Sequence, residues 1–454
     1  MTKKIRFNAF EMNCIAHQSP GLWRHPQDRS LEYNQIEYWT DLAKILEQGK
    51  FDGIFIADVL GVYDVYHQSA DAALHGAVQV PVNDPLQVIP IMAAVTTHLG
   101  FGLTTSVSFE HPYPFARRMS TLDHLTQGRI GWNIVTSYLE SGSKNIGLKT
   151  QLNHDERYDF ADEYLTVLYK LWEGSWQSDA VHRDKHSGIF ADANKVHAID
   201  HVGQYFSVPG IHLCEPSPQR TPVLYQAGAS SRGQTFASQH AECIFIAAPS
   251  KIATKKLVHS IEQQLIHAGR RREDVKIYAL VSIVTDDTDQ KATAKFQEYQ
   301  RYGSQEGALT LLSGWSGVDF SQYQATDQVE YVHSNAIQSL LDSYVNADPQ
   351  RVWTVDEIAR WNTLGGNGPV FVGSASTVAD TLESWVEETG VDGFNLAYIL
   401  AHQSFIDIVQ WIVPELQRRG VYPLEYTEGT LRHKLFQKGD IISKSHQAYQ
   451  YKNK

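Results

Sequence analysis

The chain has 454 residues, of which 42% are hydrophobic and 11% aromatic, so it can bury the large core of an ordinary globular protein. Its 39 Lys and Arg residues against 51 Asp and Glu residues give a formal net charge of -12. Since there is no block of basic residues, this charge argues against nucleic acid or an anionic membrane as a partner.

The three cysteines, Cys14, Cys214 and Cys243, are widely spaced, which indicates a reducing compartment and neither a disulfide framework nor a zinc site. The N-terminal segment has no sustained apolar region of the kind found in signal peptides. No run approaches the roughly 20 apolar residues that a membrane helix needs. We therefore expect a cytoplasmic protein.

One pattern repeats along the chain: a short apolar run, a polar loop, an amphipathic helix, and a glycine before the next apolar run. The first helix shows the spacing, since Ile36, Trp39, Leu42 and Leu46 recur at helical intervals before Gly49. Such alternation of strands and helices predicts a parallel sheet. The expected strands begin at Ile5, Phe51, Gly100, Arg129, Pro222, Cys243, Lys276 and Gly393.

This count of strands favours an α/β fold of the (β/α)8 TIM-barrel type, formed by a single domain over residues 1–454. The sequence GKFDGI at 49–54 is echoed by GVDGF at 390–394, as expected where the two ends of a closed barrel meet. Two polar, irregular stretches, about 173–220 and 303–367, are predicted insertions, and long insertions in compact domains are usually functional. Residues from about 422 to 454 are expected to form a C-terminal arm.

The stretch 128–158 carries the strongest functional signal. The apolar, β-branched run 129–135 predicts a buried strand, and it ends in the polar residues Thr136, Ser137 and Tyr138, where a barrel strand would open onto a binding face. Further along, Arg157 and Tyr158 lie at a predicted helix start. A polar strand end beside an aromatic helix start suits a flat ligand with polar edges.

Two other positions follow predicted strands and are candidates for ligand binding. The loop 227–233, AGASSRG, precedes a helix, where small residues and backbone N–H groups suit a phosphate; an ordinary capped loop is the alternative. Asp58 follows the apolar run 54–57, where barrels carry functional groups, or it caps the next turn.

Two polar clusters admit a structural interpretation as well as a functional one. Cys14 and His17 form either a polar pair in a pocket or a buried cysteine and a satisfied histidine. The acidic and histidine residues of 154–159 are of metal-ligand types, but their place at a helix start favours capping, so we predict no metal site. The absence of GxGxxG after a strand, of a Walker loop, and of HExxH and GxSxG motifs argues against a tightly held nicotinamide, zinc hydrolysis and a serine nucleophile.

Several blocks together carry a resemblance that spans almost the whole chain. They are NAFEMNCIAH, GLWRHP, GKFDGIFIADVLGVYDVY, VPVNDP, RRMSTLDHLTQGRIGWNIVTSYL, HDERYDFADEYL, CEPSPQRTPVLYQAGASSRG and GVDGFNLAY. The chain resembles the flavin-dependent monooxygenases of the bacterial luciferase-like superfamily. Within it, the chain is similar to the group that oxidises long-chain alkanes, dimethylsulfide, nitrilotriacetate and dibenzothiophene sulfone.

The resemblance implies a TIM barrel with insertions, assembled as a homodimer or homotetramer. It implies a two-component system in which a separate NAD(P)H:FMN reductase supplies reduced FMN. Reaction with O2 would give a flavin C4a-(hydro)peroxide that transfers one oxygen atom to the substrate while the other leaves as water. The cofactor carries this chemistry, and the protein orients it and excludes water.

The resemblance also assigns residues. The expected FMN-binding residues are Asp58, Ser137, Tyr138, Tyr158, Ala227, Gly228, Ala229 and Ser230. The expected catalytic-pocket residues are Cys14, His17, Tyr63, Gln79 and Tyr138.

The resemblance bears on the substrate too. Tyr138 and Leu311 occupy positions where the alkane-oxidising members carry histidines. At both positions this chain resembles the dimethylsulfide-oxidising members instead. This favours a small organosulfide such as dimethylsulfide. The alternatives are a long-chain alkane or an aminopolycarboxylate with the same chemistry, or a flavin-binding protein without turnover.

Overall fold

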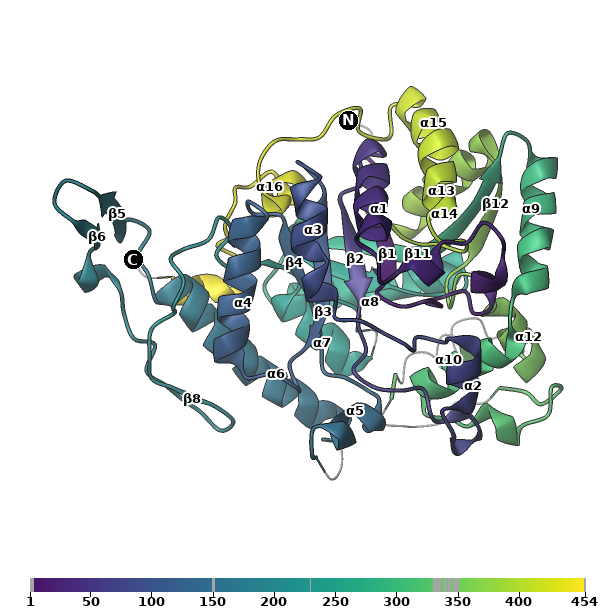
Figure 1. Cartoon of the computed structure of the whole chain (residues 1–454), viewed down its shortest axis with the longest axis horizontal. Coiled ribbons are helices and arrows are strands. Elements are labelled where there is room, and N and C mark those ends of the chain that lie inside the picture. The colour runs from purple at the N-terminus through teal and green to yellow at the C-terminus, as the bar shows by residue number, and fades with distance from the viewer. Residues whose placement is uncertain are drawn as a thin grey trace.

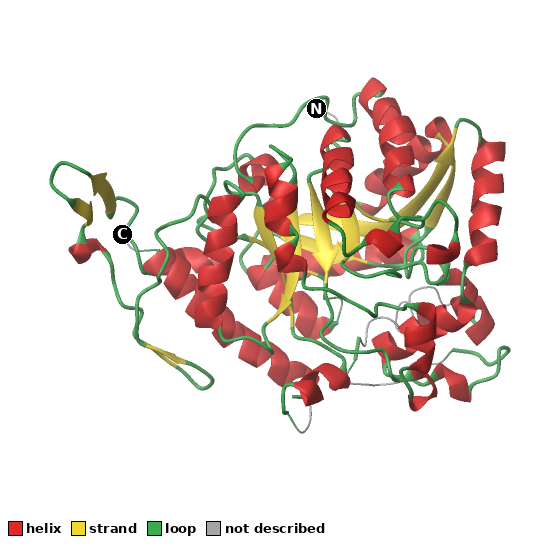
Figure 2. Cartoon of the chain, in the orientation of Figure 1, coloured by secondary structure: helices red, strands yellow, loops and turns green. Residues whose placement is uncertain are grey.

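The computed structural model describes residues 4–148, 152–228, 230–329, 336–337, 341, 344–345 and 351–452. Eight parallel strands close into a barrel at its centre, because β11 pairs with both β10 and β13 and β13 returns to β1 (Figures 1 and 2). The predicted (β/α)8 TIM barrel is confirmed, and each strand begins at the predicted residue or one or two residues later. The barrel strands are β1 (Arg6–Met12), β2 (Gly53–Ala57), β3 (Gly100–Ser106), β4 (Ile130–Val135), β9 (Val223–Gln226), β10 (Cys243–Ile246), β11 (Lys276–Asp286) and β13 (Gly393–Ala397).

The repeated Asp-Gly joint marks the two strands that flank β1. β1 pairs with β2 on one side and with β13 on the other. A Cβ atom on Gly393 would lie 2.0 Å from the carbonyl oxygen of Arg6, and one on Gly53 would lie 2.9 Å from that of Gly100. Glycine is therefore required at both joints by the close approach of neighbouring backbones.

Helices cover the outside of the barrel, as Figure 2 shows. Helix α1 (Ile36–Gln48) turns its predicted apolar stripe inward, and Trp39, Leu42 and Leu46 are fully buried against the strands. The remaining helices of this layer are α3 (Ile89–Ala94), α4 (Pro112–Leu125), α6 (His154–Tyr169), α7 (Ser231–His240), α8 (Lys251–His267), α9 (Asp289–Tyr302), α13 (Ala375–Thr389), α14 (Gln403–Asp407) and α15 (Val413–Arg418). Within the described ranges, no helix has the combination of length and apolar character that crossing a membrane requires.

The stretch 303–367 is more regular than the sequence pattern indicates. It contains α10 (Gln305–Ser316) and α12 (Val355–Trp361), which pack with α2 (Asp71–Gly76) over one side of the carboxyl end of the barrel. Directly after it lies β12 (Val370–Ser374), a strand that was not predicted from the sequence. β12 pairs with the second half of the unusually long β11, outside the closed ring.

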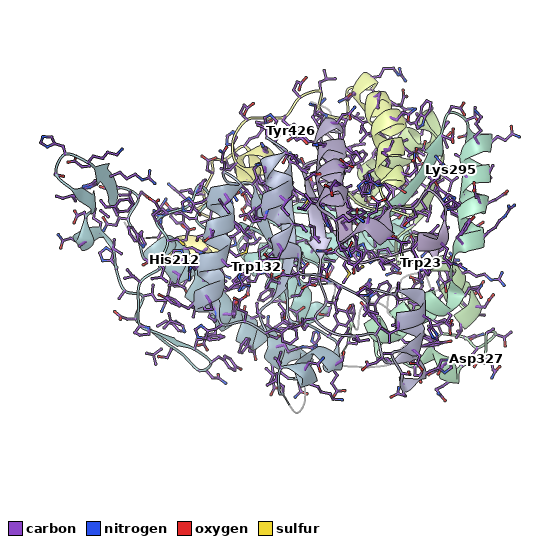
Figure 3. The ribbon with its side chains drawn as sticks, viewed as in Figure 1. Trp23, Trp132, His212, Lys295, Asp327 and Tyr426 are labelled. Atoms are coloured by element: carbon purple, nitrogen blue, oxygen red, sulfur yellow. The ribbon has the colours of Figure 1, made fainter. Side chains whose placement is uncertain are left out.

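The stretch 173–220 forms an arm that projects from the barrel (Figure 1). It holds two short hairpins, β5 (Val181–Asp184) with β6 (Ile189–Ala191) and β7 (His201–Val202) with β8 (Ser207–Val208). His212, labelled in Figure 3, ties the arm down, because its Nε2 atom lies 2.9 Å from the Ser120 hydroxyl of α4.

The C-terminal residues 422–452 wrap across the amino end of the barrel. The Tyr422 hydroxyl donates to the Gly49 carbonyl oxygen at 3.0 Å. Further on, α16 (Leu431–Phe436) inserts Leu431 and Leu435 among Tyr225, Phe245 and other ring side chains inside the barrel. This segment closes the amino end, which leaves the carboxyl end as the open one.

Candidate active site at the carboxyl end of the barrel

A cavity of about 330 Å³ opens at the carboxyl ends of the strands, the face where TIM barrels place their active sites. Its volume lies within the range of small-molecule pockets. Three aromatic rings stack across its floor: Phe10 and Phe55 at 5.1 Å, and Phe55 and Phe245 at 4.6 Å, all nearly parallel. This floor separates the cavity from the residues of α16.

One side of the cavity is formed by two converging helix starts. The first turn of α6 supplies His154, Arg157 and Tyr158, and Ser230 caps the N-terminus of α7 by accepting from the Gly233 N–H at 3.1 Å. The His154 Nε2 atom lies 3.3 Å from the Ser230 hydroxyl. Burial lowers the pKa of Arg157 from its usual value. A buried guanidinium beside two helix N-termini suits an anionic group such as a phosphate.

The ends of β2 and β4 form a second, polar wall. Ser137 has a left-handed backbone with φ 60, and its hydroxyl donates to the Ser106 hydroxyl at 2.7 Å. This turn brings the next residue, Tyr138, into the cavity wall. At the end of β2, burial and the neighbouring charge of Asp84 raise the pKa of Asp58 to about 7. A carboxyl group of this kind takes up or releases a proton near neutral pH.

A hydrogen-bonded network lies behind Tyr138. Its hydroxyl is 2.5 Å from that of Tyr63, which is fully buried. The Tyr63 hydroxyl lies 2.8 Å from the Gln79 Oε1 atom and accepts from the Trp315 Nε1–H at 3.0 Å. Gln79 in turn donates from Nε2 to the His17 carbonyl oxygen at 2.7 Å. The network therefore links two strand ends, the loop before β3 and helix α10.

Two buried polar atoms in the cavity wall have no hydrogen-bond partner within the described part of the chain. Asn133 donates from its Nδ2 atom to the Thr104 hydroxyl at 3.0 Å, but its Oδ1 atom is unpaired. The Nδ1 atom of His17 is unpaired as well, and burial lowers the pKa of this histidine to about 3, so it is neutral. Buried polar atoms without partners are costly, so these atoms indicate a ligand with complementary polar groups.

The structure brings together most of the residues that the sequence singled out. Those that line the cavity are Asp58, Ser137, Tyr138, Tyr158, Ala227, Gly228, Ser230, His17 and Gln79. Tyr63 lies one layer behind, in contact with Tyr138, and buried Cys14 is also outside the cavity lining. The predicted Ala229 lies outside the described residues.

Several lining residues were not predicted from the sequence, among them Asn133, Gln226, Asn395 and Trp315. For Asn133 a signal was present, because it interrupts an apolar strand. The period of two along a strand turns Asn133 to the face away from that of Trp132, which is part of the core between the strands and the helices. A polar residue in the middle of a buried strand is a candidate for the barrel interior. Trp315 carried no such signal, because only tertiary packing brings α10 to the cavity.

The fold and the cavity define the class: a TIM-barrel protein with a cavity of small-molecule size at the carboxyl end of its strands. Residues 15–393 match the family model of the luciferase-like monooxygenases, and the chain belongs to this family of flavin-dependent enzymes. The resemblance found in the sequence blocks is thereby confirmed at the level of the family.

Individual relatives agree. The chain is 51% identical over 454 residues to dimethyl-sulfide monooxygenase of Hyphomicrobium sulfonivorans, covering 100% of this chain and 95% of that protein. It is 49% identical to long-chain alkane monooxygenase of Geobacillus thermodenitrificans, covering 100% and 99%. Among solved structures, a riboflavin lyase with modified FMN and substrate riboflavin superimposes with a TM-score of 0.94 at 35% identity, covering 100% of both chains.

Proposed function

We propose that this protein is the oxygenase component of a two-component system, which uses reduced FMN and O2 to oxygenate a small, uncharged organosulfide. The observation that carries the proposal is the cavity with an anion-binding side, a polar wall and unpaired buried atoms at the open end of a luciferase-like barrel. The relative at 51% identity is named for dimethyl sulfide, and the riboflavin lyase structure holds a modified FMN.

The residues present fit FMN. Arg157, Ser230 and the backbone at the start of α7 would hold the phosphate, with Tyr158, Ala227 and Gly228 around it. The unpaired Asn133 Oδ1 atom is an acceptor of the kind that ring N–H groups of an isoalloxazine need. When bound, reduced FMN activates dioxygen and supplies one oxygen atom to the substrate.

The chain's own contribution is binding, orientation and exclusion of water. The stacked rings of Phe10, Phe55 and Phe245 give the cavity an apolar floor, and Trp315 adds an apolar wall. His17 is neutral and Tyr138 keeps its proton, since burial raises its pKa well above the usual value. Such surroundings protect a reactive oxygen species from solvent and hold the substrate against it.

The charge of the cavity supports an uncharged substrate. Arg157 is the single Arg or Lys side chain among the described residues that line it, and we assign it to the cofactor phosphate. An aminopolycarboxylate would need several converging cations. The substrate is therefore a neutral molecule, and the limited volume favours a small sulfide over a long alkane.

The remaining assignments belong to the same proposal. We propose one domain over residues 1–454, a cytoplasmic location and a separate NAD(P)H:FMN reductase as the partner. We also propose a homodimer or homotetramer, supported by the projecting arm, where Phe190 is 55% and Val202 is 85% exposed.

The test of this function combines the purified protein with a generic flavin reductase, NADH, FMN and air. Dimethylsulfide, a long-chain alkane and nitrilotriacetate are supplied separately, and products are identified by mass spectrometry. We expect product from the sulfide alone, dependent on reductase and FMN. Product from the alkane or the chelate would replace the substrate assignment, and FMN binding without any product would favour a non-catalytic flavin-binding protein.

The phosphate assignment has its own test. Arg157→Gln should weaken FMN binding by about ten- to hundredfold, the effect of losing one charge-assisted hydrogen bond, while riboflavin binding stays unchanged. Arg232→Gln is the matched control, because Arg232 lies over the Tyr158 ring but outside the cavity lining, where it pairs with Asp159 and Asp162. Equal losses for FMN and riboflavin in Arg157→Gln would contradict the assignment.

A further inference from the structure

The hydrogen bonds of the network behind Tyr138 have fixed donors and acceptors, and the Gln79 amide sets their direction. One end of the Gln79 amide lies 2.7 Å from the His17 carbonyl oxygen, which can only accept. The amide nitrogen must face that carbonyl, because the flipped amide would set two oxygens against each other at this distance. The Oε1 atom of Gln79 therefore faces the Tyr63 hydroxyl, 2.8 Å away, as an acceptor.

The Tyr63 hydroxyl carries one proton, and it donates this proton in a hydrogen bond to the Gln79 Oε1 atom. Trp315 Nε1–H is a donor only and occupies one acceptor position of the Tyr63 oxygen at 3.0 Å. The remaining contact, 2.5 Å to the Tyr138 hydroxyl, must therefore use the proton of Tyr138. Burial raises the pKa of both tyrosines well above the usual value, so neither loses its proton near neutral pH.

We infer that Tyr138 presents only an acceptor to the cavity, and that Tyr63, Gln79 and Trp315 are positioning residues that fix this polarity. The single Tyr138 proton points away from the cavity that its side chain lines. A ligand atom placed against the Tyr138 oxygen must then be a hydrogen-bond donor.

Packing prevents the network from reversing. The Tyr63 ring lies against α10 so closely that a Cβ atom on Gly314 would come within 2.2 Å of it. Gln79 has a left-handed backbone with φ 50, and its N–H donates to the Ala16 carbonyl oxygen at 3.1 Å. A non-glycine residue in this conformation is held by its surroundings, which keeps the amide in place.

This polarity selects the redox state of the cofactor and so deepens the proposed function, on which it rests. Reduction of a flavin converts acceptor nitrogen positions of the ring system into N–H donors. The Tyr138 oxygen, which can only accept, would form a hydrogen bond with a ring N–H group of the reduced flavin. The same oxygen would be repelled by the nitrogen lone pair of the oxidised flavin. Tyr138 therefore favours binding of reduced over oxidised FMN.

The experiment measures dissociation constants of oxidised FMN in air and of reduced FMN under anaerobic conditions. Tyr63→Phe removes the acceptor for the Tyr138 proton. Gln79→Leu instead lets Tyr63 donate to Tyr138, whose own proton is then released toward the cavity. We expect both variants to lower the preference for reduced FMN by about tenfold, as one matched hydrogen bond becomes unmatched. A tenfold loss corresponds to a potential of bound FMN lower by about 30 mV.

Tyr344→Phe is the control, because it removes a buried tyrosine hydroxyl from the same apolar cluster as Tyr63, where it accepts from the Asn362 Nδ2 atom at 2.8 Å outside the cavity lining. The preference of this variant for reduced FMN should stay within about twofold of the wild-type value, since the protons of Tyr63 and Tyr138 keep their directions. Wild-type preference in both Tyr63→Phe and Gln79→Leu would overturn the inference while leaving the proposed function intact. Absence of FMN binding by the wild-type protein in either redox state would overturn the proposed function, and the inference with it.

Discussion

Two groups of buried polar side chains, around Arg432 at the amino end of the barrel and around Asn133 at the carboxyl end, differ in how their hydrogen bonds are satisfied. At the amino end, Arg432 is 2% exposed and uses all its donors: it forms a bidentate pair with Glu242 at 2.7 and 2.8 Å and donates to several backbone carbonyls. Nearby, Asp52 accepts from Arg6 at 2.9 Å and from the Tyr278 hydroxyl at 3.0 Å. At the carboxyl end, buried atoms of Asn133 and His17 are without partners among the described residues.

This difference in hydrogen bonding suggests that the two groups of residues serve different roles, one in the stability of the fold and the other in ligand binding. The side chains of Arg432, Glu242 and Asp52 at the amino end have their hydrogen-bond partners within the protein, so we expect substitutions of these residues to act on folding. We propose that those at the carboxyl end bind a ligand, and we therefore expect substitutions there to act on binding. This is the division expected of TIM barrels, whose amino-terminal faces serve stability and whose carboxyl-terminal faces carry the active site.

The largest effect is expected from substituting Arg432 at the closed, amino end of the barrel. Arg432→Met leaves the Glu242 carboxylate buried without its cation, and we expect the free energy of unfolding to fall by about 3–5 kcal/mol. Urea denaturation followed by circular dichroism measures the change. Lys444→Met, an exposed cation on the same segment, should change stability by less than about 0.5 kcal/mol. An Arg432→Met protein of normal stability that has lost FMN binding would contradict the division of roles.

The next effect concerns Asp58 at the open end, whose pKa is raised to about 7, mainly by burial. The folded state keeps a proton that the unfolded state releases at lower pH, so ionisation of Asp58 costs stability as pH rises toward 7. Asp58→Asn should therefore unfold at higher temperature than the wild type above pH 7, and this advantage should shrink as pH falls toward about 4. Thermal unfolding across that pH range measures it.

Asp159→Asn is the control for this pH dependence, since the Asp159 carboxylate is 63% exposed. Its difference from the wild type should not grow between pH 4 and 8 in the way expected for Asp58→Asn. The same growth in both variants would show that the effect does not come from burial at the site.

The smallest effects are expected at the phosphate side. Tyr158→Phe and Ser230→Ala each remove one hydroxyl and should weaken FMN binding by about three- to tenfold, as expected for single hydrogen bonds. Because Ser230 also caps α7, the pair Ser230→Asn and Ser230→Asp separates the roles: both keep a capping side chain, but only aspartate repels a phosphate. Fluorescence titration gives the affinities. Unchanged FMN affinity in both Tyr158→Phe and Ser230→Ala would remove these residues from the site.

Much of the barrel is encoded by local sequence patterns. Short apolar runs, helical spacing such as that of α1, and Asp-Gly joints are readable in the chain, and all eight barrel strands follow from them. β12 was missed because its strand residues alternate between buried and half-buried and its partner is the far end of β11, a pairing that no local pattern announces. The regular helices α10 and α12 were hidden in a stretch that is poor in clear helical stripes.

The sequence by itself determined the barrel, the position of polar residues at strand ends, and the family of the chain, because each of these depends on residues close together or on long blocks in order. Only the tertiary structure decided what those residues do to one another. Whether Cys14 or Trp315 reaches the cavity, and which way the protons of Tyr63 and Tyr138 point, depends on contacts between separate segments, from 16 positions apart for Tyr63 and Gln79 to 252 for Tyr63 and Trp315. Hydrogen-bond direction is a property of the whole network, since each donor is assigned only after its neighbour.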